Sequence, residues 1–181
     1  MAVFPDKQKK LHQELDQILG RSRLPMLSNR VQLAYTDAVI HETLRFSTIL
    51  PFSLLHKTTT DIHFWGYDIP KDTMIVPNLY DSNFNAKVWG DPENFRPERF
   101  LTDDGKFMKN NAFFPFSVGK RACLGETLAR DELIIFVSGL FQKFSVSLDP
   151  NQLVPSLEAK FNQICSPDPH QLVIKERNRT Y

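Results

Sequence analysis

The feature that most constrains the fold is an apolar segment inside the strongest helical pattern of the chain. The pattern predicts a helix over residues 124–144, with charged residues gathered in its first half. Its second half contains LIIFVSGLF, residues 133–141, which is apolar nearly all round. A helix of this kind is buried on more than one side, so other elements must pack around it. The chain has the material for such a core, since 41% of its residues are hydrophobic and 15 are Phe.

Helices and short strands account for the rest of the chain. Apolar spacing predicts helices over residues 4–19 and 33–46, the first ended by Gly20 and the second followed by Pro51. Residues 52–79 are β-rich and broken by Gly and Pro, which indicates small strands. Residues 80–122 are mostly irregular, because three prolines interrupt them. Residues 152–176 are expected to form a hairpin region around 167–169. The prediction is one mainly α domain with small β-sheets, of the α+β class, over residues 1–181.

Composition excludes several classes of protein. A net charge of +1 argues against nucleic acid as a partner. Two cysteines are too few for a disulfide framework. No apolar run approaches 18 residues, and MAVFPDKQKK has no secretory core. The chain enters its first helix almost directly, as a fragment is expected to do.

One cysteine lies in a loop that is rich in Phe and Gly and carries two cations, FPFSVGKRACLG, residues 114–125. Phe116 and Gly119 bracket a tight turn, and we expect Cys123 in the first turn of the following helix. Backbone N–H groups and the positive end of the helix dipole favour a thiolate there. The neighbouring Arg121 adds positive charge, as does Lys120.

Gly125 lacks a side chain, so a large flat group has room to approach the start of the helix. An ordinary buried cysteine is the alternative interpretation of Cys123. A zinc site is excluded because the neighbouring sequence supplies no further ligands. A catalytic cysteine is not favoured, because no signature of that class surrounds it.

The pattern Phe-x-x-Gly-x-Arg-x-Cys-x-Gly resembles the haem-binding signature of the cytochrome P-450 superfamily, in which one cysteine thiolate holds the iron. The resemblance implies that Cys123 is the axial ligand of haem b (iron protoporphyrin) and that Arg121 bonds a propionate. It also implies that His56 bonds the second propionate. The cofactor-binding set is therefore Cys123, Arg121, His56, Phe116, Gly119 and Gly125.

A second motif agrees with this resemblance. Glu42 and Arg45 share one helix face in a stripe poor in charge, which favours a buried ion pair over a solvated one. Arg99, in NFRPERF, is available as a third member. The family has the same Glu–Arg–Arg triad, whose structural role there is to lock the loop that carries the cysteine.

The order of motifs resembles the C-terminal part of the family over nearly the whole chain, and most of all the microsomal animal members. The resemblance implies a lipophilic substrate and a flavoprotein reductase docked on a proximal face that includes Lys120 and Arg130. A stretch near 163–169 is expected to line part of the substrate pocket, together with Ile49, Leu50, Pro51, Phe52, Ser53 and Leu54.

Two departures from the family are visible. Residues 83–86, Asn-Phe-Asn-Ala, stand where the family usually has histidines followed by Asp-Pro, which casts doubt on a short helix there. Family members are also more than twice as long, and nothing in this chain matches their N-terminal half, membrane anchor or long distal helix. We therefore expect a poorly soluble fragment that is inactive alone. The resemblance places the parent protein on the cytosolic face of the endoplasmic reticulum membrane.

Three functions follow from the resemblance. The parent is expected to be a monooxygenase that inserts one oxygen atom of O₂ into a steroid, fatty acid or xenobiotic. A haem-thiolate isomerase or dehydratase acting on peroxides is an alternative within the same fold. A truncated, non-enzymatic haem-binding product is the third.

Overall fold

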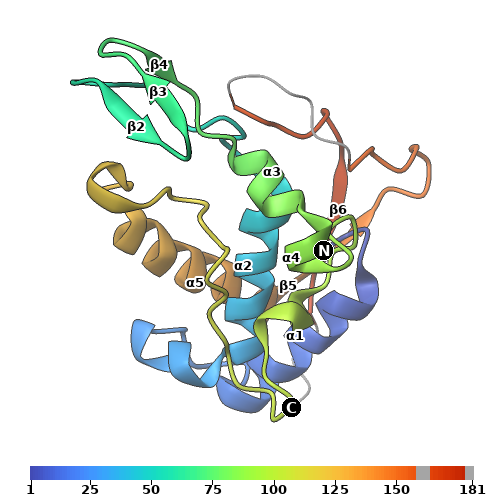
Figure 1. The fold of residues 1–181 in the computed structure, drawn as a ribbon. Coiled ribbons are helices and arrows are strands. Elements are labelled where there is room, and N and C mark those ends of the chain that lie inside the picture. Colours follow the sequence, from blue (N-terminus) through green and yellow to red (C-terminus); the bar gives the residue numbers. More distant parts are fainter. Residues whose placement is uncertain (158–163, 178–181) are drawn as a thin grey trace.

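Three helices form the body of the protein. The computed structural model describes residues 1–157 and 164–177. Helix α1 (Pro5–Ile18), helix α2 (Ala34–Ser47) and helix α5 (Glu126–Lys143) all pack against one another, with α2 in the middle of the view in Figure 1. The remaining elements are short: η1 (Leu27–Gln32), β1 (His56–Lys57), β2 (Ile62–Phe64), β3 (Tyr67–Ile69), β4 (Met74–Ile75), α3 (Leu79–Phe84), α4 (Ala86–Trp89), η2 (Pro97–Phe100), η3 (Gly119–Arg121), β5 (Phe144–Leu148) and β6 (Leu172–Glu176).

Two apolar clusters fill the interior. The first joins α1 to the end of α5 and to β5, and consists of Leu11, Leu15, Leu19, Leu33, Phe141 and Val146. The second joins α2 to the irregular segment that follows α3, and consists of Ala38, Trp89, Phe100 and Phe113. Helix α2 lies between them, so it connects the two halves of the core.

The ends of α2 are fixed by contacts that lie outside the helix. The Glu14 carboxylate of α1 accepts hydrogen bonds from the backbone N–H groups of Tyr35 and Thr36 at 2.7 and 2.8 Å. These are N–H groups that a helix leaves without an internal partner. At the other end Thr48 adopts φ +36° and its hydroxyl donates to the carbonyl of Arg45. The chain therefore leaves α2 abruptly, toward residues 49–55.

Within residues 1–157 and 164–177 the sheets are two-stranded and antiparallel, pairing β1 with β4, β2 with β3 and β5 with β6. Hairpin β2–β3 stands clear of the helices at the upper left of Figure 1, and Trp65 at its turn is 87% exposed. Trp89, by contrast, is 4% exposed.

The hairpin expected within residues 152–176 falls partly outside the described residues, and the described pairing involves a strand before that region. Strand β6 pairs with β5, from Phe144 opposite Glu176 to Leu148 opposite Leu172. Helix α5 ends at Lys143 and the chain continues directly in an extended conformation, so β5 begins at Phe144, the last residue that the sequence pattern had assigned to the helix. Residues 158–163 of the expected partner lie outside the described residues.

Helix α5 is shorter than expected and only partly enclosed. Gly125 occupies the N-cap position, so the helix begins at Glu126 rather than at residue 124. Ile134 and Phe141 are buried, whereas Phe136 is 70% exposed and Leu140 is 43% exposed. The expectation of burial on more than one side is therefore wrong for these residues, because the elements described here cover one face of the helix. Among the described residues, no helix combines the length and apolar content needed to cross a lipid bilayer.

Candidate functional site

The cysteine loop is closed at its base by one backbone hydrogen bond. The N–H of Cys123 donates to the carbonyl of Phe116 at 2.9 Å. Between these residues the chain turns sharply, with φ of +64° at Ser117 and +73° at Gly119. Glycine adopts such angles without steric cost, whereas a residue with a Cβ is strained there. The loop is thus a defined turn with its cysteine at one end.

Cys123 does not lie in the first turn of α5, as the sequence analysis expected. It precedes the first helical residue by three positions, and its carbonyl accepts a bond from the N–H of Glu126 at 3.4 Å. The conformation of Gly125 at the N-cap accounts for the difference, since the helix begins only after it. A Cβ added to Gly125 would lie 3.9 Å from the Cys123 sulfur, so the glycine keeps space beside the thiol.

The two cysteines differ in their surroundings. Cys123 is exposed, whereas Cys165 is 8% exposed. Lys120 and Arg121, in the short helix η3 before the cysteine, are also exposed. Over residues 1–157 and 164–177, no group of three His, Cys, Asp or Glu side chains is arranged to hold a metal ion. A lone exposed thiol, flanked by cations, is the available donor in this loop.

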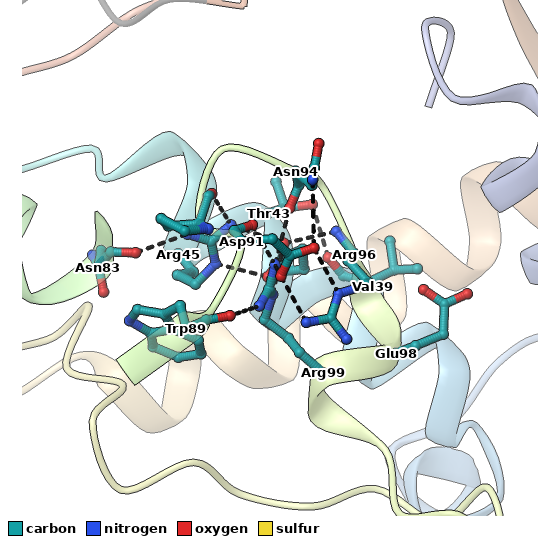
Figure 2. Close-up of polar contacts among 12 residues, drawn as sticks. Val39, Thr43, Arg45, Asn83, Trp89, Asp91, Asn94, Arg96, Glu98 and Arg99 are labelled. Carbon is teal, nitrogen blue, oxygen red and sulfur yellow. Dashed lines mark hydrogen bonds and ion pairs between the residues drawn. The ribbon is translucent and has the colours of Figure 1, made fainter. Parts of the chain in front are cut away.

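The structure brings Glu42, Arg45 and Arg99 together in the interior. Arg45 donates to both carboxylate oxygens of Glu42, at 2.8 and 2.9 Å, and both side chains are fully buried. Its remaining donors reach the carbonyls of Asn83 and Pro92 at 2.7 and 2.8 Å, as Figure 2 shows for Asn83. Burial of this charge is tolerable because its hydrogen bonds are satisfied.

Arg99 binds the other side of the Glu42 carboxylate at 3.1 Å. It also donates to three backbone carbonyls, those of Trp89, Asp91 and Asn94, at 2.8, 3.1 and 3.0 Å (Figure 2). The Arg96 guanidinium hydrogen-bonded to Asp91 holds the pKa of that carboxyl well below its usual range. The two arginines that bind Glu42 therefore also bind backbone carbonyls within residues 83–99, so this segment is held around the buried triad.

The hydrogen bonds of the triad reach residues 83–99 rather than the cysteine loop. The connection to the loop is indirect and passes through Phe100, which follows Arg99 in η2. The Phe100 ring packs edge to face against Phe113, with ring centroids 5.2 Å apart, and Phe113 directly precedes the cysteine loop. In the described residues this aromatic contact is the connection between the triad segment and the residue that precedes the loop.

Residues 83–86 lie at the junction of two short helices in spite of the departure from the family pattern: α3 ends at Phe84, Asn85 is extended, and α4 begins at Ala86. The Asn83 carbonyl accepts from Arg45, and its side chain donates to the Thr48 hydroxyl at 3.2 Å. The Asn85 side chain caps α4 by accepting from the N–H of Lys87 at 3.0 Å. Short helices therefore form here despite the doubt raised by the sequence, with α3 capped by the side chain of Asn78 and α4 by that of Asn85.

The remaining site residues lie on other parts of the fold. His56 is half-buried in β1, opposite Ile75 in β4. In the proposed pocket lining, Pro51 is buried and the others are half-buried or exposed, namely Ile49, Leu50, Phe52, Ser53 and Leu54. The carbonyl of Ile49 accepts from the N–H of Cys165 at 2.8 Å, which links this stretch to residues near 165. Residue 163 of the second expected stretch lies outside the described part of the chain.

Arg130 is engaged inside the protein rather than offered at the surface. Its side chain is 16% exposed and bonds to Glu126 at 2.8 Å. It also donates to the Nε2 atom of His41 at 2.7 Å. Sequence reasoning missed His41, because a histidine between Ile40 and Glu42 on a helix carries no signal of its contact with residue 130. Lys120 remains the exposed member of the expected docking pair.

Comparison with known proteins places these features in one family. The sequence model described as Cytochrome P450 matches residues 1–174. The chain belongs to the cytochrome P450 family. It is 44% identical over 177 residues to "Cytochrome P450 2D3" of Rattus norvegicus, covering 98% of this chain and 35% of that protein. It is 37% identical over 177 residues to "Cytochrome P450 2U1" of Homo sapiens, covering 98% of this chain and 32% of that protein.

A third relative, "Cytochrome P450 2J3" of Rattus norvegicus, is 42% identical over 172 residues, which is 95% of this chain and 34% of the relative. The chain thus spans about a third of the length of the curated relatives it matches. Its helices and small sheets are a part of the P450 fold, of the type found in animal microsomal members.

Proposed function

We propose that this chain is the cysteine-bearing part of a haem-thiolate monooxygenase that inserts one oxygen atom of O₂ into a lipophilic substrate. The observation that carries the proposal is the exposed Cys123 thiol at the end of a closed loop, directly before α5. Its occurrence in a chain of the cytochrome P450 family supports iron as the partner of the sulfur. When bound, a thiolate-ligated haem supplies the electron density that favours cleavage of the O–O bond.

The donor set suits haem iron better than zinc. Structural zinc requires four protein ligands and catalytic zinc three, whereas the described residues offer one exposed thiol without a His, Cys or carboxylate cluster beside it. In the proposal Cys123 ligates the iron of haem b, and Arg121 and His56 bond its two propionates. Phe116, Gly119 and Gly125 shape the loop and leave room for the flat ring.

The substrate and the partner are proposed from two parts of the chain, residues 49–54 and the cations of the cysteine loop. The stretch 49–54 is largely apolar and exposes Phe52 and Leu54, which suits contact with a lipophilic molecule such as a steroid, fatty acid or xenobiotic. The exposed cations Lys120 and Arg121 suit an acidic surface on a flavoprotein reductase. We place the whole protein on the cytosolic face of the endoplasmic reticulum membrane, from its similarity to microsomal members.

Residues 1–181 alone are proposed to lack turnover. They correspond to about a third of the relatives' length, and the described residues leave a large apolar surface uncovered. Hydroxylation of a lipophilic substrate by these residues alone, with a reductase present, would refute this part of the proposal.

The test is the absorbance spectrum of the haem-loaded chain after reduction and addition of carbon monoxide. Thiolate ligation shifts the Soret band strongly to longer wavelength. We expect that band in the unmodified chain and in Cys165→Ala, and its loss in Cys123→Ala. Equal spectra for Cys123→Ala and the unmodified chain would overturn the assignment of the iron ligand.

A further inference from the structure

A polar contact in the interior connects α2 to the cysteine loop. His41 lies on α2 and is 4% exposed, enclosed by the rings of Phe100, Phe107 and Phe113 with centroids 5.5, 4.6 and 5.2 Å away. Its Nδ1 atom lies 2.7 Å from the carbonyl of Asp37. This bond and the three surrounding rings hold the imidazole in the observed orientation.

The partners of His41 fix which of its nitrogens carries the proton. A guanidinium has donors and no acceptor, so Nε2 accepts the 2.7 Å bond from Arg130. A backbone carbonyl accepts, so Nδ1 carries the proton and donates to Asp37. Nδ1 thus faces the carbonyl of Asp37 and, at 3.2 Å, its carboxylate, while Nε2 provides the acceptor that Arg130 needs in this interior.

Arg130, held by His41, in turn contacts the cysteine loop. Its guanidinium lies over the ring of Phe116, 5.1 Å from the centroid, and over the ring of Phe113 at 5.7 Å. Such a cation–ring contact is worth more when it is withdrawn from water, as it is here with Arg130 16% exposed. Phe116 is the residue whose carbonyl accepts the N–H of Cys123. Holding Phe116 therefore holds the base of the loop.

We propose that His41 and Arg130 are positioning residues for Cys123: His41 orients Arg130, and Arg130 clamps Phe116, so that the thiol is presented to the haem iron in one geometry. This inference rests on the proposed function for its reference to iron. The clamping of the loop itself is a property of the chain without haem. The cation at 130 then acts inside the protein, in place of the expected docking role at the surface.

The test compares two substitutions at His41 that are matched in length. His41→Gln retains a side-chain oxygen that is able to accept from Arg130, whereas His41→Met has no comparable acceptor. Arg130→Gln removes the clamp itself, and Lys109→Gln, at an exposed position outside the loop, is the control. Two quantities are measured: hydrogen exchange of residues 114–125 in the haem-free chain, and the fraction of thiolate-type Soret band in the haem-loaded, reduced, CO-treated chain.

We expect His41→Met and Arg130→Gln to speed exchange in residues 114–125 by about tenfold, since one charge-assisted bond is lost, with exchange in α1 unchanged. His41→Gln and Lys109→Gln are expected to change it less than about twofold by the same reasoning. The thiolate-type fraction should fall in His41→Met and Arg130→Gln and recover in His41→Gln. A residue that serves general stability alone would lower haem binding in all forms without changing this fraction.

The outcomes separate this inference from the proposed function. Unchanged exchange and an unchanged thiolate-type fraction in both His41→Met and Arg130→Gln would overturn the inference and leave the proposed function intact. Faster exchange, with no thiolate-type band even in the unmodified chain, would overturn the proposed function and support the clamp. If Arg130→Gln loses helical content, Phe116→Leu replaces it, because it removes the clamped ring and leaves the bond between His41 and Arg130; normal exchange in Phe116→Leu would also overturn the inference.

Discussion

Glu42 is the residue on which the interior of this protein depends most directly. Its carboxylate is fully buried and serves two guanidinium groups, those of Arg45 and Arg99, together with the backbone N–H of Arg96 at 2.8 Å. Removing one partner of such an arrangement leaves uncompensated charge in a medium of low polarity. If the charge of Glu42 is lost, the two guanidinium groups of Arg45 and Arg99 stay buried without a counter-charge, and this contributes more to the loss of stability than the missing hydrogen bonds.

Glu42→Gln is expected to lower the free energy of unfolding by about 3–5 kcal/mol, the loss typical of a broken buried ion pair. The measurement is the urea midpoint of unfolding, followed by circular dichroism. Glu98→Gln is the matched control: Glu98 binds Lys7 and Lys10 at 3.1 and 2.7 Å, but near the surface. Its loss is expected to cost less than about 1 kcal/mol. Similar midpoints for the two variants would contradict the structural role given to Glu42.

Residue types and spacing made part of this site predictable. Positions three apart on a helix share a face, so Glu42 and Arg45 were expected to pair, and Arg99 was expected to join them through resemblance. The carbonyl partners of the two arginines were not predictable, since every residue has a carbonyl and side-chain identity does not say which one lies nearby. The contact between His41 and Arg130 spans 89 positions and likewise leaves no local signal.

At the scale of elements, the joining of α1 to β5 depends on one glutamine. Gln8 is 5% exposed, and its side chain donates to the carbonyl of Val146 and accepts from the N–H of the same residue, both at 2.8 Å. The amide thus occupies the backbone groups of β5 that a further strand would otherwise occupy. It connects the first helix of the chain to the hairpin that ends the described residues.

Gln8→Met is expected to destabilise the protein by about 2–4 kcal/mol, because both backbone groups of Val146 lose their partner in a buried setting. Thermal unfolding measures the change, and faster hydrogen exchange over 144–148 should accompany it. Gln13→Met, on the exposed side of the same helix, is the control and should leave both quantities nearly unchanged. An equal effect of the two substitutions would show that the bonds to Val146 contribute nothing particular.

Helix positions were predictable from apolar spacing to within one or two residues, and strand pairing was not. The two earlier helices run from 5 to 18 and from 34 to 47, against expected ranges of 4–19 and 33–46. Strand β6 pairs with a strand 28 positions earlier, and alternation within one strand does not specify a partner. The cap of α2 by Glu14 was missed for the same reason, since it comes from another helix.

At the scale of the molecule, the described residues leave apolar side chains uncovered along one side of α5. Leu124 and Leu128 at its start are exposed, as are Phe136 and Leu140 further along. Exposed apolar side chains gathered on one element mark a surface suited to contact with another element or a partner. The described residues therefore enclose α2 more fully than α5, in a chain that spans about a third of the length of its relatives.

Phe136→Lys is expected to reduce self-association of the chain, because Phe136 is 70% exposed. It should not lower the unfolding midpoint, because Phe136 belongs to neither of the two core clusters. Light scattering as a function of concentration measures the association. Phe141→Lys, one turn or so further along the same helix, places a charge in the first core cluster and should prevent folding. Unchanged association in Phe136→Lys would show that another surface is responsible.

The contrasting positions of the two tryptophans give the molecule a pair of built-in optical reporters. Trp65 lies at the tip of the projecting hairpin, so its emission should resemble that of the free indole and be quenched readily by acrylamide. Trp89 lies beneath Arg45 and Arg99, with each guanidinium carbon within 5.8 Å of its ring, so its emission senses the packing of the charged interior. In a Trp65→Phe variant only Trp89 emits, so the fluorescence would follow loosening of the charged interior without a contribution from the hairpin.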